Sequence, residues 1–491
     1  METRRRARIE QRLKRWVALG LGWIGASDRG ASRRPENRSS TLVELAELSW
    51  PIAAAMVGET AIGLVDTKLV GGLGAAALGA VGIANTLMFL NYALVFGLMR
   101  GVKIRTAYAV GHGRPEDGVA YAKAGVVMGG ISGVVVWLVA RDVTWALEAL
   151  RVDPELVPFA RDFFAAITWG SPATCVVAAL IQHRQGLGDA RTPMLVGLAG
   201  NLVNAILAWA LIYGRLGFPA LGVRGAGYGT ATTEVLEMLV MLALLARDVA
   251  RSRVKSALSV RRALRRAAEL GLPTGVQFGA EMLAFTAFTA ILGGIGGREI
   301  AAHQVALATI RTSFLPGVAV GEAASVLVGR ALARKNLAEA DRVTRAALFL
   351  AVSFMSVCGV IFAVFGGAIA RAFTPDVAVA AIARRLLWIA AIFQVLDGVQ
   401  IVFRGALRGA KDVRVPAYIG IAVVWTCVPG AAFGLSKLLG WGAFGGWCGF
   451  IAETLFASVL FGWRWSRGAW RASASAALPV RASANPGDVA A

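Results

Sequence analysis

The chain has 491 residues, of which 57% are hydrophobic and 16% are charged, and its mean hydropathy is +0.62. Soluble chains of this length are far less apolar, so the composition excludes a soluble globular protein and indicates a membrane protein with many spans. The formal net charge of +21 would suggest nucleic-acid binding in a soluble chain. No basic motif with interleaved aromatic residues accompanies it, which argues against a nucleic-acid partner.

Long apolar runs recur along the chain without the alternating pattern of strands, so we expect helical spans, which satisfy their own backbone hydrogen bonds in lipid. We predict twelve, at residues 48–70, 86–110, 120–140, 163–183, 193–213, 226–246, 270–292, 304–328, 346–370, 382–404, 415–436 and 443–463. The predicted organisation is a basic cytoplasmic N-terminal arm (1–44), an N-lobe (45–247), a cytoplasmic linker (248–267), a C-lobe (268–464) and a cytoplasmic tail (465–491).

Two stretches reveal an internal repeat. One begins at Ala46 and reads AELSWPIAAAMVGETAIGLVDTKLVGGLG, and the other begins at Ala268 and reads AELGLPTGVQFGAEMLAFTAFTAILGGIG. Pro51 and Pro273 coincide at an offset of 222 residues (273 minus 51), while QGLGDARTP and RGAKDVRVP coincide at an offset of 223. Six spans return the chain to the same side, so the repeat is parallel, and we expect the substrate site near the membrane midplane between its halves.

Basic residues gather in alternate connections. They lie at the N-terminus, between spans six and seven, between spans eight and nine, and at Arg404, Arg408, Lys411 and Arg414. The intervening connections, such as residues 71–84, carry almost none. The positive-inside rule therefore predicts a multi-pass protein of the cell (inner) membrane with both termini in the cytoplasm.

Carboxylates inside predicted spans are the candidate functional residues. Glu59 and Asp66 lie in the first span, Glu281 in the seventh and Asp397 in the tenth. A carboxylate in a bundle stays ionised only beside a cation or a fixed partner and otherwise takes up a proton, so it suits the exchange of a substrate cation for a coupling ion. The alternative is a structural ion pair, for which Arg404, seven residues after Asp397, is a candidate.

Several other polar residues and prolines are weaker candidates. Asn201 and Asn204 lie one turn apart in span five, where they would bond across helices or coordinate an ion. His303 would either titrate near neutral pH or serve as a packing residue. Pro51 and Pro273 each remove a backbone bond from the first span of a half, which permits a hinge. The remaining carboxylates, Glu234, Glu237 and Glu453, are weaker still, and a solvated face at the end of span six would explain the first two.

These features resemble the multidrug and toxic-compound extrusion (MATE) family over residues 45–465, and the NorM-like branch in particular. The segments that carry the resemblance are LVDTKLVGGLG (64–74), QGLGDARTPM (185–194), LGVRGAGYGTA (221–231), REIAAHQVAL (298–307) and QVLDGVQIVFRGALRGAKD (394–412). The resemblance implies an all-α membrane protein with two six-helix lobes in a V, alternating access, and export of cationic amphipathic drugs in exchange for sodium ions or protons, without a cofactor.

The resemblance also implies roles for particular residues. Asp66 matches the acidic residue of the VDT segment, which is implicated in proton or cation coupling. Glu281 and Asp397 match the cation site of the NorM-like branch, so Na⁺ is possible there. Asn204 matches the asparagine of a site in another branch, but that branch has an aspartate where this chain has Ala208, which favours protons at Asp66. Glu59 matches no family position and is a candidate through its symmetry with Glu281.

The sequence thus predicts an antiporter of small organic cations that works in the lipid bilayer as a monomer. A second interpretation is an exporter or flippase of a metabolite or lipid-linked intermediate on the same fold, since fold does not determine substrate. A third is a membrane-embedded enzyme. The acidic interior argues against the flippase, and three scattered histidines without a DDxxD-like cluster argue against the enzyme.

Overall fold

The computed structural model describes residues 38–141, 144–149, 152–251, 256–468 and 470–471. These residues form helices and short connections without a strand, and twelve of the helical segments are long and apolar enough to cross a membrane. The predictions for the basic arm up to residue 37 and for the tail from residue 472 lie outside the described residues.

The helices fall into two halves in chain order. The first half contains α2 (Arg38–Gly71), α3 (Ala75–Gly111), α4 (Pro115–Ala140), α5 (Thr144–Ala149), α6 (Val157–Ile167), η2 (Thr168–Gly170), α7 (Ser171–Gly186), α8 (Arg191–Tyr213) and α9 (Val223–Arg251). The second half contains α10 (Val260–Gly293), α11 (Gly297–Ala333), α12 (Leu337–Phe373), α13 (Val377–Gly409), α14 (Arg414–Ala431), the π-helical η3 (Ala432–Leu438) and α15 (Gly442–Ser466). Each of the twelve predicted spans lies within one of the twelve apolar helical segments, so their number and order are confirmed.

Two predictions about connections are wrong. Residues 71–84 were expected to form a connection, but α3 begins at Ala75 and only three residues, Gly72–Gly74, separate it from α2. The φ angle of Gly74 is +112°, a conformation that glycine adopts readily. Arg404 and Arg408 were assigned to a basic connection, but both lie inside α13. Apolarity locates a span but not its ends, because alanine and arginine extend a helix as well as leucine does.

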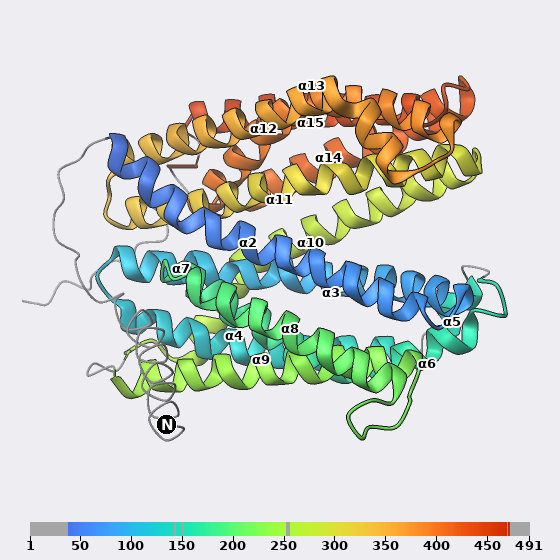
Figure 1. Cartoon of the computed structure of the whole chain (residues 1–491). Helices are drawn as coiled ribbons and strands as arrows, with labels where there is room; N and C mark the ends of the chain where they lie inside the picture. Colours follow the sequence, from blue (N-terminus) through green and yellow to red (C-terminus); the bar gives the residue numbers. More distant parts are fainter. Residues whose placement is uncertain (1–37, 142–143, 150–151, 252–255, 469, 472–491) are drawn as a thin grey trace, which may run out of the picture. The chain divides into compact units, whose positions relative to one another are not determined.

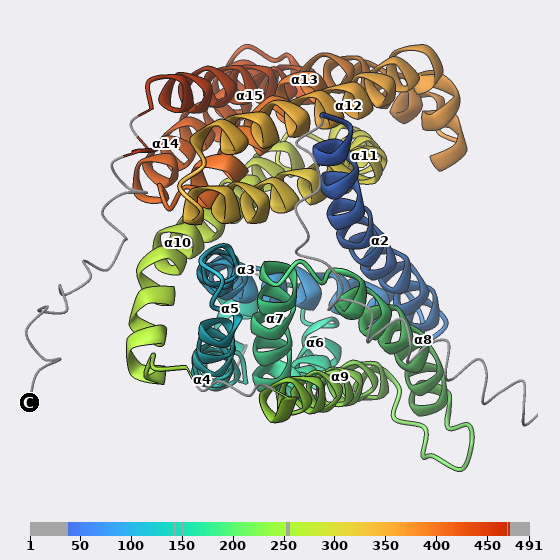
Figure 2. The ribbon, with the colours of Figure 1, turned by 90° about the vertical axis from the view of Figure 1, so that its left-hand side faces the viewer.

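The helices α2 and α10 each pass from one half to the other. Leu45 and Ile52 near the start of α2 are buried in a cluster with Ala323 of α11, whereas the end of α2 bonds α8, where the Tyr213 hydroxyl donates to the Leu69 carbonyl at 2.6 Å. The first part of α10 packs on α3 and its last part on α14 and η3, as Figures 1 and 2 show. The repeat thus places the first helix of each half in equivalent surroundings.

Glycines let α3 and α10 approach each other backbone to backbone. A Cβ atom on Gly97 would lie 2.5 Å from Gly275 Cα, and one on Gly275 would lie 2.5 Å from the Leu94 carbonyl oxygen. Small residues at a helix crossing are the usual means of close packing in lipid, where the hydrophobic effect does not drive helices together. This crossing joins the two halves along α3, which carries part of the site described next.

Candidate functional site

The first half holds a carboxylate and an amide that the sequence pointed to separately. The Asn204 side chain of α8 donates to both carboxylate oxygens of Asp66 of α2, at 3.2 and 3.1 Å. Asn204 is buried, and its Oδ1 atom has no hydrogen-bond partner among the described residues. Asp66 and Asn204 therefore form one polar site. An oxygen atom of each residue can accept a hydrogen bond or coordinate a cation there.

Three further carboxylates that lie inside membrane-spanning helices of the same half form a second group. Glu59 of α2 is exposed, and it lies within electrostatic reach of Glu234 and Glu237 of α9, which are half-buried. In the described part of the chain, no basic side chain forms an ion pair with any of the three. The interpretation of Glu234 and Glu237 as a solvated face at the end of span six is wrong, because they lie near the middle of α9.

A cavity of about 270 Å³ between α8 and α9 adjoins one of these carboxylates. Its lining is apolar except for Thr233 and Glu237. The Glu237 carboxylate lies directly against Gly200 of α8, where a Cβ atom would overlap it. The cavity is open on one side, where Leu195, Leu236 and Val240 are exposed, so it places apolar surface next to the Glu237 carboxylate without enclosing a ligand.

The second half pairs its carboxylates differently. Arg404 of α13 donates to both oxygens of Glu281 of α10, at 2.9 and 3.1 Å, and Gln277 donates to Glu281 at 2.9 Å. The sequence suggested Arg404 as a partner for Asp397, but Asp397 is buried and accepts a hydrogen bond from Gln400 at 2.9 Å instead. Arg404 lies seven residues after Asp397 and therefore on the same face of α13, but Glu281 of α10 lies within direct hydrogen-bond distance of the guanidinium.

A third carboxylate completes this group. Gln400 also donates to Glu453 of α15 at 3.4 Å, and Glu453 lies within electrostatic reach of Asp397, Glu281 and Arg404. The structure therefore places Glu281 and Asp397, which the resemblance implies as one cation site, within electrostatic reach of the same guanidinium, that of Arg404, and of Glu453.

The remaining candidates have simpler surroundings. His303 is buried in an aromatic cluster, where Trp447 donates to its Nδ1 atom at 3.2 Å and Thr289 lies 3.5 Å from its Nε2 atom, so the geometry favours the packing interpretation. The Asn201 amide of α8 lies against Gly58 of α2, with its Nδ2 atom 3.2 Å from the position of a Cβ. Pro51 and Pro273 lie inside α2 and α10, and their hinge role stays a prediction.

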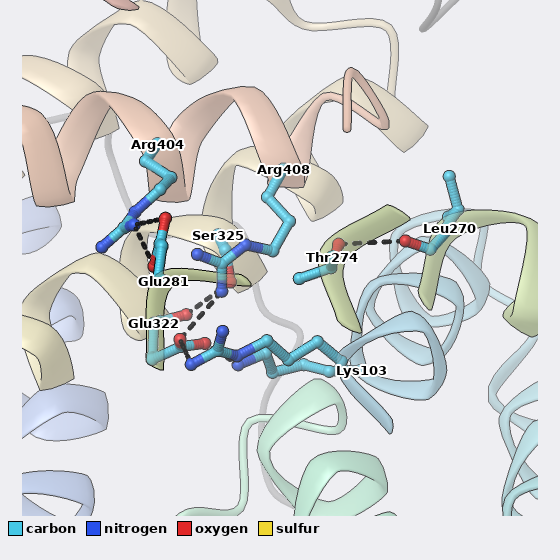
Figure 3. Close-up of polar contacts among 9 residues, drawn as sticks. Lys103, Leu270, Thr274, Glu281, Glu322, Ser325, Arg404 and Arg408 are labelled. Carbon is cyan, nitrogen blue, oxygen red and sulfur yellow. Dashed lines mark hydrogen bonds and ion pairs between the residues drawn. The ribbon is translucent and has the colours of Figure 1, made fainter. Parts of the chain in front are cut away.

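Sequence reasoning missed a buried ionic cluster between the halves. Glu322 of α11 accepts a hydrogen bond from Arg408 of α13 at 2.8 Å and forms an ion pair with Lys103 of α3. Its carboxylate also lies 3.2 Å from a terminal guanidinium nitrogen of Arg100 of α3. Figure 3 shows Lys103 and Arg408 approaching Glu322 from different helices, with the Arg404–Glu281 pair nearby. Glu322 lies inside predicted span eight, so an intramembrane carboxylate was a signal that could have found it.

Comparisons with known proteins agree with the repeat. The family model described as MatE matches residues 51–210 and again residues 273–432, at the same offset of 222 residues (273 minus 51). The chain is 30% identical over 421 residues to the probable multidrug resistance protein NorM of Xylella fastidiosa, covering 85% of this chain and 90% of that protein. It is 31% identical over 435 residues to the probable NorM of Xanthomonas campestris pv. campestris, covering 88% of this chain and 95% of that protein.

Among solved structures, a MOP superfamily transporter from Pyrococcus furiosus has a similar fold. The TM-score is 0.79 at 21% identity, and the alignment covers 90% of this chain and 99% of that one. A multidrug resistance MATE family transporter in an outward-facing conformation also aligns with a TM-score of 0.79 at 21% identity, over 90% of this chain and 99% of that one.

Proposed function

Because the chain belongs to the MatE family and is a NorM-like MATE transporter, we propose that it exports organic cations in exchange for protons or sodium ions by alternating access. The observation that carries this proposal is the group of Glu59, Glu234 and Glu237, which has no basic partner in the described residues. Carboxylates in that situation are stable only when a proton or another cation balances them. An amphipathic cation and a coupling ion would therefore compete for this half.

Asp66 and Asn204 are the proposed proton site of the first half. The Asn204 amide already donates to both oxygens of Asp66, and Asn204 Oδ1 remains free to accept a bond among the described residues. Protonation of Asp66 would supply a hydroxyl donor and remove one negative charge from the half that holds the substrate cation. Release of that cation and uptake of the proton would then be linked.

Glu281, Asp397 and Glu453 are the proposed second coupling site. Arg404 compensates one of these three carboxylates, so the site retains acidic groups that a sodium ion or a proton can balance. Moving one elementary charge across 100 mV is worth about 2.3 kcal/mol. Exchange for one or two coupling ions therefore sustains a large gradient of a cationic drug.

The proposal includes an orientation in the cell membrane with both termini in the cytoplasm. Two features support it: twelve apolar helical segments, an even number, return the chain to its starting side, and the helix ends at Arg184, Arg330 and Arg408 are basic. The protein is further proposed to act as a monomer and to need no cofactor.

Efflux of a fluorescent organic cation from proteoliposomes tests the proposal, with a proton gradient and a sodium gradient imposed separately. We expect Asp66→Asn to abolish proton-driven efflux, and Asp397→Asn and Glu281→Gln to abolish sodium-driven efflux if the second site is the coupling site. Asp162→Asn is the matched control, because Asp162 pairs with Arg224 on an exposed surface. Absence of efflux for every cation under both gradients would contradict the proposal and favour export of a metabolite or lipid-linked intermediate.

A further inference from the structure

We propose that Glu322 of α11, together with Lys103 and Arg100 of α3, is a latch that holds the two halves of the transporter together at the end where α3 and α11 terminate. Lys103 is fully buried, and Glu322 is 6% exposed. The carboxylate lies eleven residues before the last residue of α11, or about 16 Å along the helix axis. The ion pairs are therefore deep within the helical bundle, where each retains more of its strength than a surface pair.

The repeat explains why this latch lies between the halves. Arg100 and Glu322 occupy equivalent positions in the two copies, since 322 minus 100 is 222. Equivalent residues touch only where the axis that relates the copies passes between them, as at any isologous contact. Identical charged residues would repel each other there, but this chain has a guanidinium on one side and a carboxylate on the other, at 3.2 Å.

Other polar contacts join the same two halves further toward that end. Arg330 of α11 donates to the Gly186 carbonyl at the end of α7, at 3.2 Å. The Lys411 ammonium, in the connection after α13, lies 3.4 Å from the ring centre of Tyr108 of α3. Both contacts cross between the halves, so the two halves touch each other over an extended length around Glu322.

The charges around Glu322 are arranged so that the latch can open. Glu322 and Arg408 belong to the same half and stay paired at 2.8 Å when α3 moves away, so opening strands no carboxylate. Arg100 and Lys103 leave with α3 and are hydrated by the water that enters. A buried ion pair stabilises the joined state of the halves. It does not prevent their separation when each partner is paired with another charge or hydrated afterwards.

Polar residues on α13 connect the latch to the carboxylates of the second half. Gln400, Arg404 and Arg408 follow one another at one-turn intervals, and they contact Asp397, Glu281 and Glu322 respectively. Arg100 of the latch also lies 5.0 Å from the Phe278 ring centre of α10 and within electrostatic reach of Glu281 and Arg404. Occupancy of the carboxylates thus acts on the latch through Arg404, a step that rests on the proposed transport function.

Spin-label distance measurements on the full chain in nanodiscs test the latch without any transport assay. The four native cysteines are replaced by alanine, and labels at Arg114→Cys and Ala338→Cys report the separation of the halves at the latch end. Labels at Phe218→Cys and Leu438→Cys report the opposite end. We expect Glu322→Gln to raise the ratio of separated to joined molecules about tenfold or more, because it removes both ion pairs that cross between the halves and leaves their buried cations uncompensated. Lys103→Gln should raise the ratio by a smaller factor, because it removes one of those two ion pairs while Arg100 still pairs with Glu322.

Three variants separate a latch from a merely structural cluster. Arg464→Gln breaks a partly buried ion pair with Asp412 inside the second half, at 2.5 Å, and should leave the distances unchanged. Arg408→Gln should also leave the halves joined, because Arg100 and Lys103 then hold Glu322 alone. Exchange of the symmetric pair, Arg100→Glu with Glu322→Arg, should restore the joined state relative to Glu322→Gln.

Unchanged distances in both Lys103→Gln and Glu322→Gln, in protein that is monodisperse on size exclusion, would overturn the proposal. An equal shift in Arg464→Gln would do the same. If either Glu322→Gln or Lys103→Gln fails to fold, the other of the two variants still decides the question. For the connection through α13, we expect Glu281→Gln to raise the separated fraction and Glu281→Gln with Arg404→Gln to restore it. If the variants change the distances as expected but the wild-type protein exports no cation, the latch is retained and the proposed transport function is refuted.

Discussion

Glu59 and Glu281 occupy the same position in the two halves, since 281 minus 59 is 222, yet their surroundings differ. Glu281 is held by the Arg404 guanidinium through two hydrogen bonds. Glu59 is exposed, has no ion pair with a described basic residue, and lies near two other carboxylates of its half. The repeat thus preserved the position of a carboxylate while its charge balance changed.

This difference assigns different tasks to the halves. A carboxylate that carries its own counter-charge keeps a defined geometry and responds weakly to a substrate cation. Carboxylates without a counter-charge must acquire a proton or a cation from outside, which makes their half sensitive to the substrate. Removing, restoring or transplanting the counter-charge therefore tests whether the two halves differ in this way.

Removing the paired carboxylate should have the largest effect. We expect Glu281→Gln to destabilise the protein by about 3 kcal/mol, because the partly buried Arg404 guanidinium loses its direct ion-pair partner among the described residues. Glu59→Gln should cause no loss, since it removes a carboxylate from a group that has no cation. Thermal unfolding in detergent micelles compares the two variants, and equal destabilisation would show that the halves do not differ in charge balance.

Removing both members of the pair should recover most of that loss. Glu281→Gln with Arg404→Gln leaves two neutral groups, so we expect a coupling free energy of about 2 kcal/mol between the positions in a double-mutant cycle. The same unfolding assay measures it. If the losses of stability in the two single variants simply add in the double variant, the two side chains stabilise the protein independently, which would contradict the ion pair in the structure.

Transplanting the counter-charge should make the first half resemble the second. Ile181 of α7 is the repeat counterpart of Arg404, since 404 minus 223 is 181. It lies two turns after Thr174 on the same face of α7. Thr174 in turn lies beside Glu234 of α9. We expect Ile181→Arg to weaken binding of a fluorescent organic cation about tenfold by balancing the carboxylates. Ile181→Met is the size control, and unaltered affinity in a folded Ile181→Arg protein would contradict the assigned role of the first half.

The smallest effect concerns a cation that forms no ion pair with a carboxylate among the residues that the structure describes. Burial lowers the pKa of Lys411, in the connection between α13 and α14, to about 7, and Arg105 and Arg266 add to the shift. Between about pH 7 and the ordinary pKa of lysine, the unfolded chain binds more protons at this position, so this residue makes stability rise with pH. We expect Lys411→Met to reduce that rise, measured as thermal unfolding at pH 7 and pH 9. An identical pH dependence in the variant would exclude Lys411 as its source.

Local properties of the sequence determined the fold and part of the site. The twelve spans follow from apolar runs long enough to cross a bilayer, and the repeat follows from paired motifs such as those at Pro51 and Pro273, which the MatE match at residues 51–210 and 273–432 confirms. The candidate carboxylates were recognisable because a charge inside an apolar run is costly. Helix ends were not, so Arg404 and Arg408 were misplaced.

Which charges meet depends on how the helices pack against one another. Arg404 was a plausible partner for Asp397 from helical spacing, but the approach of α10 to α13 gives it to Glu281 instead. Glu322 meets Lys103 because α3 packs directly on α11, where a Cβ atom on Gly111 would lie 2.7 Å from the Arg330 carbonyl oxygen. Residues more than two hundred positions apart become neighbours through helix packing, and the periodicity of a single helix contains no record of which helix will lie against it.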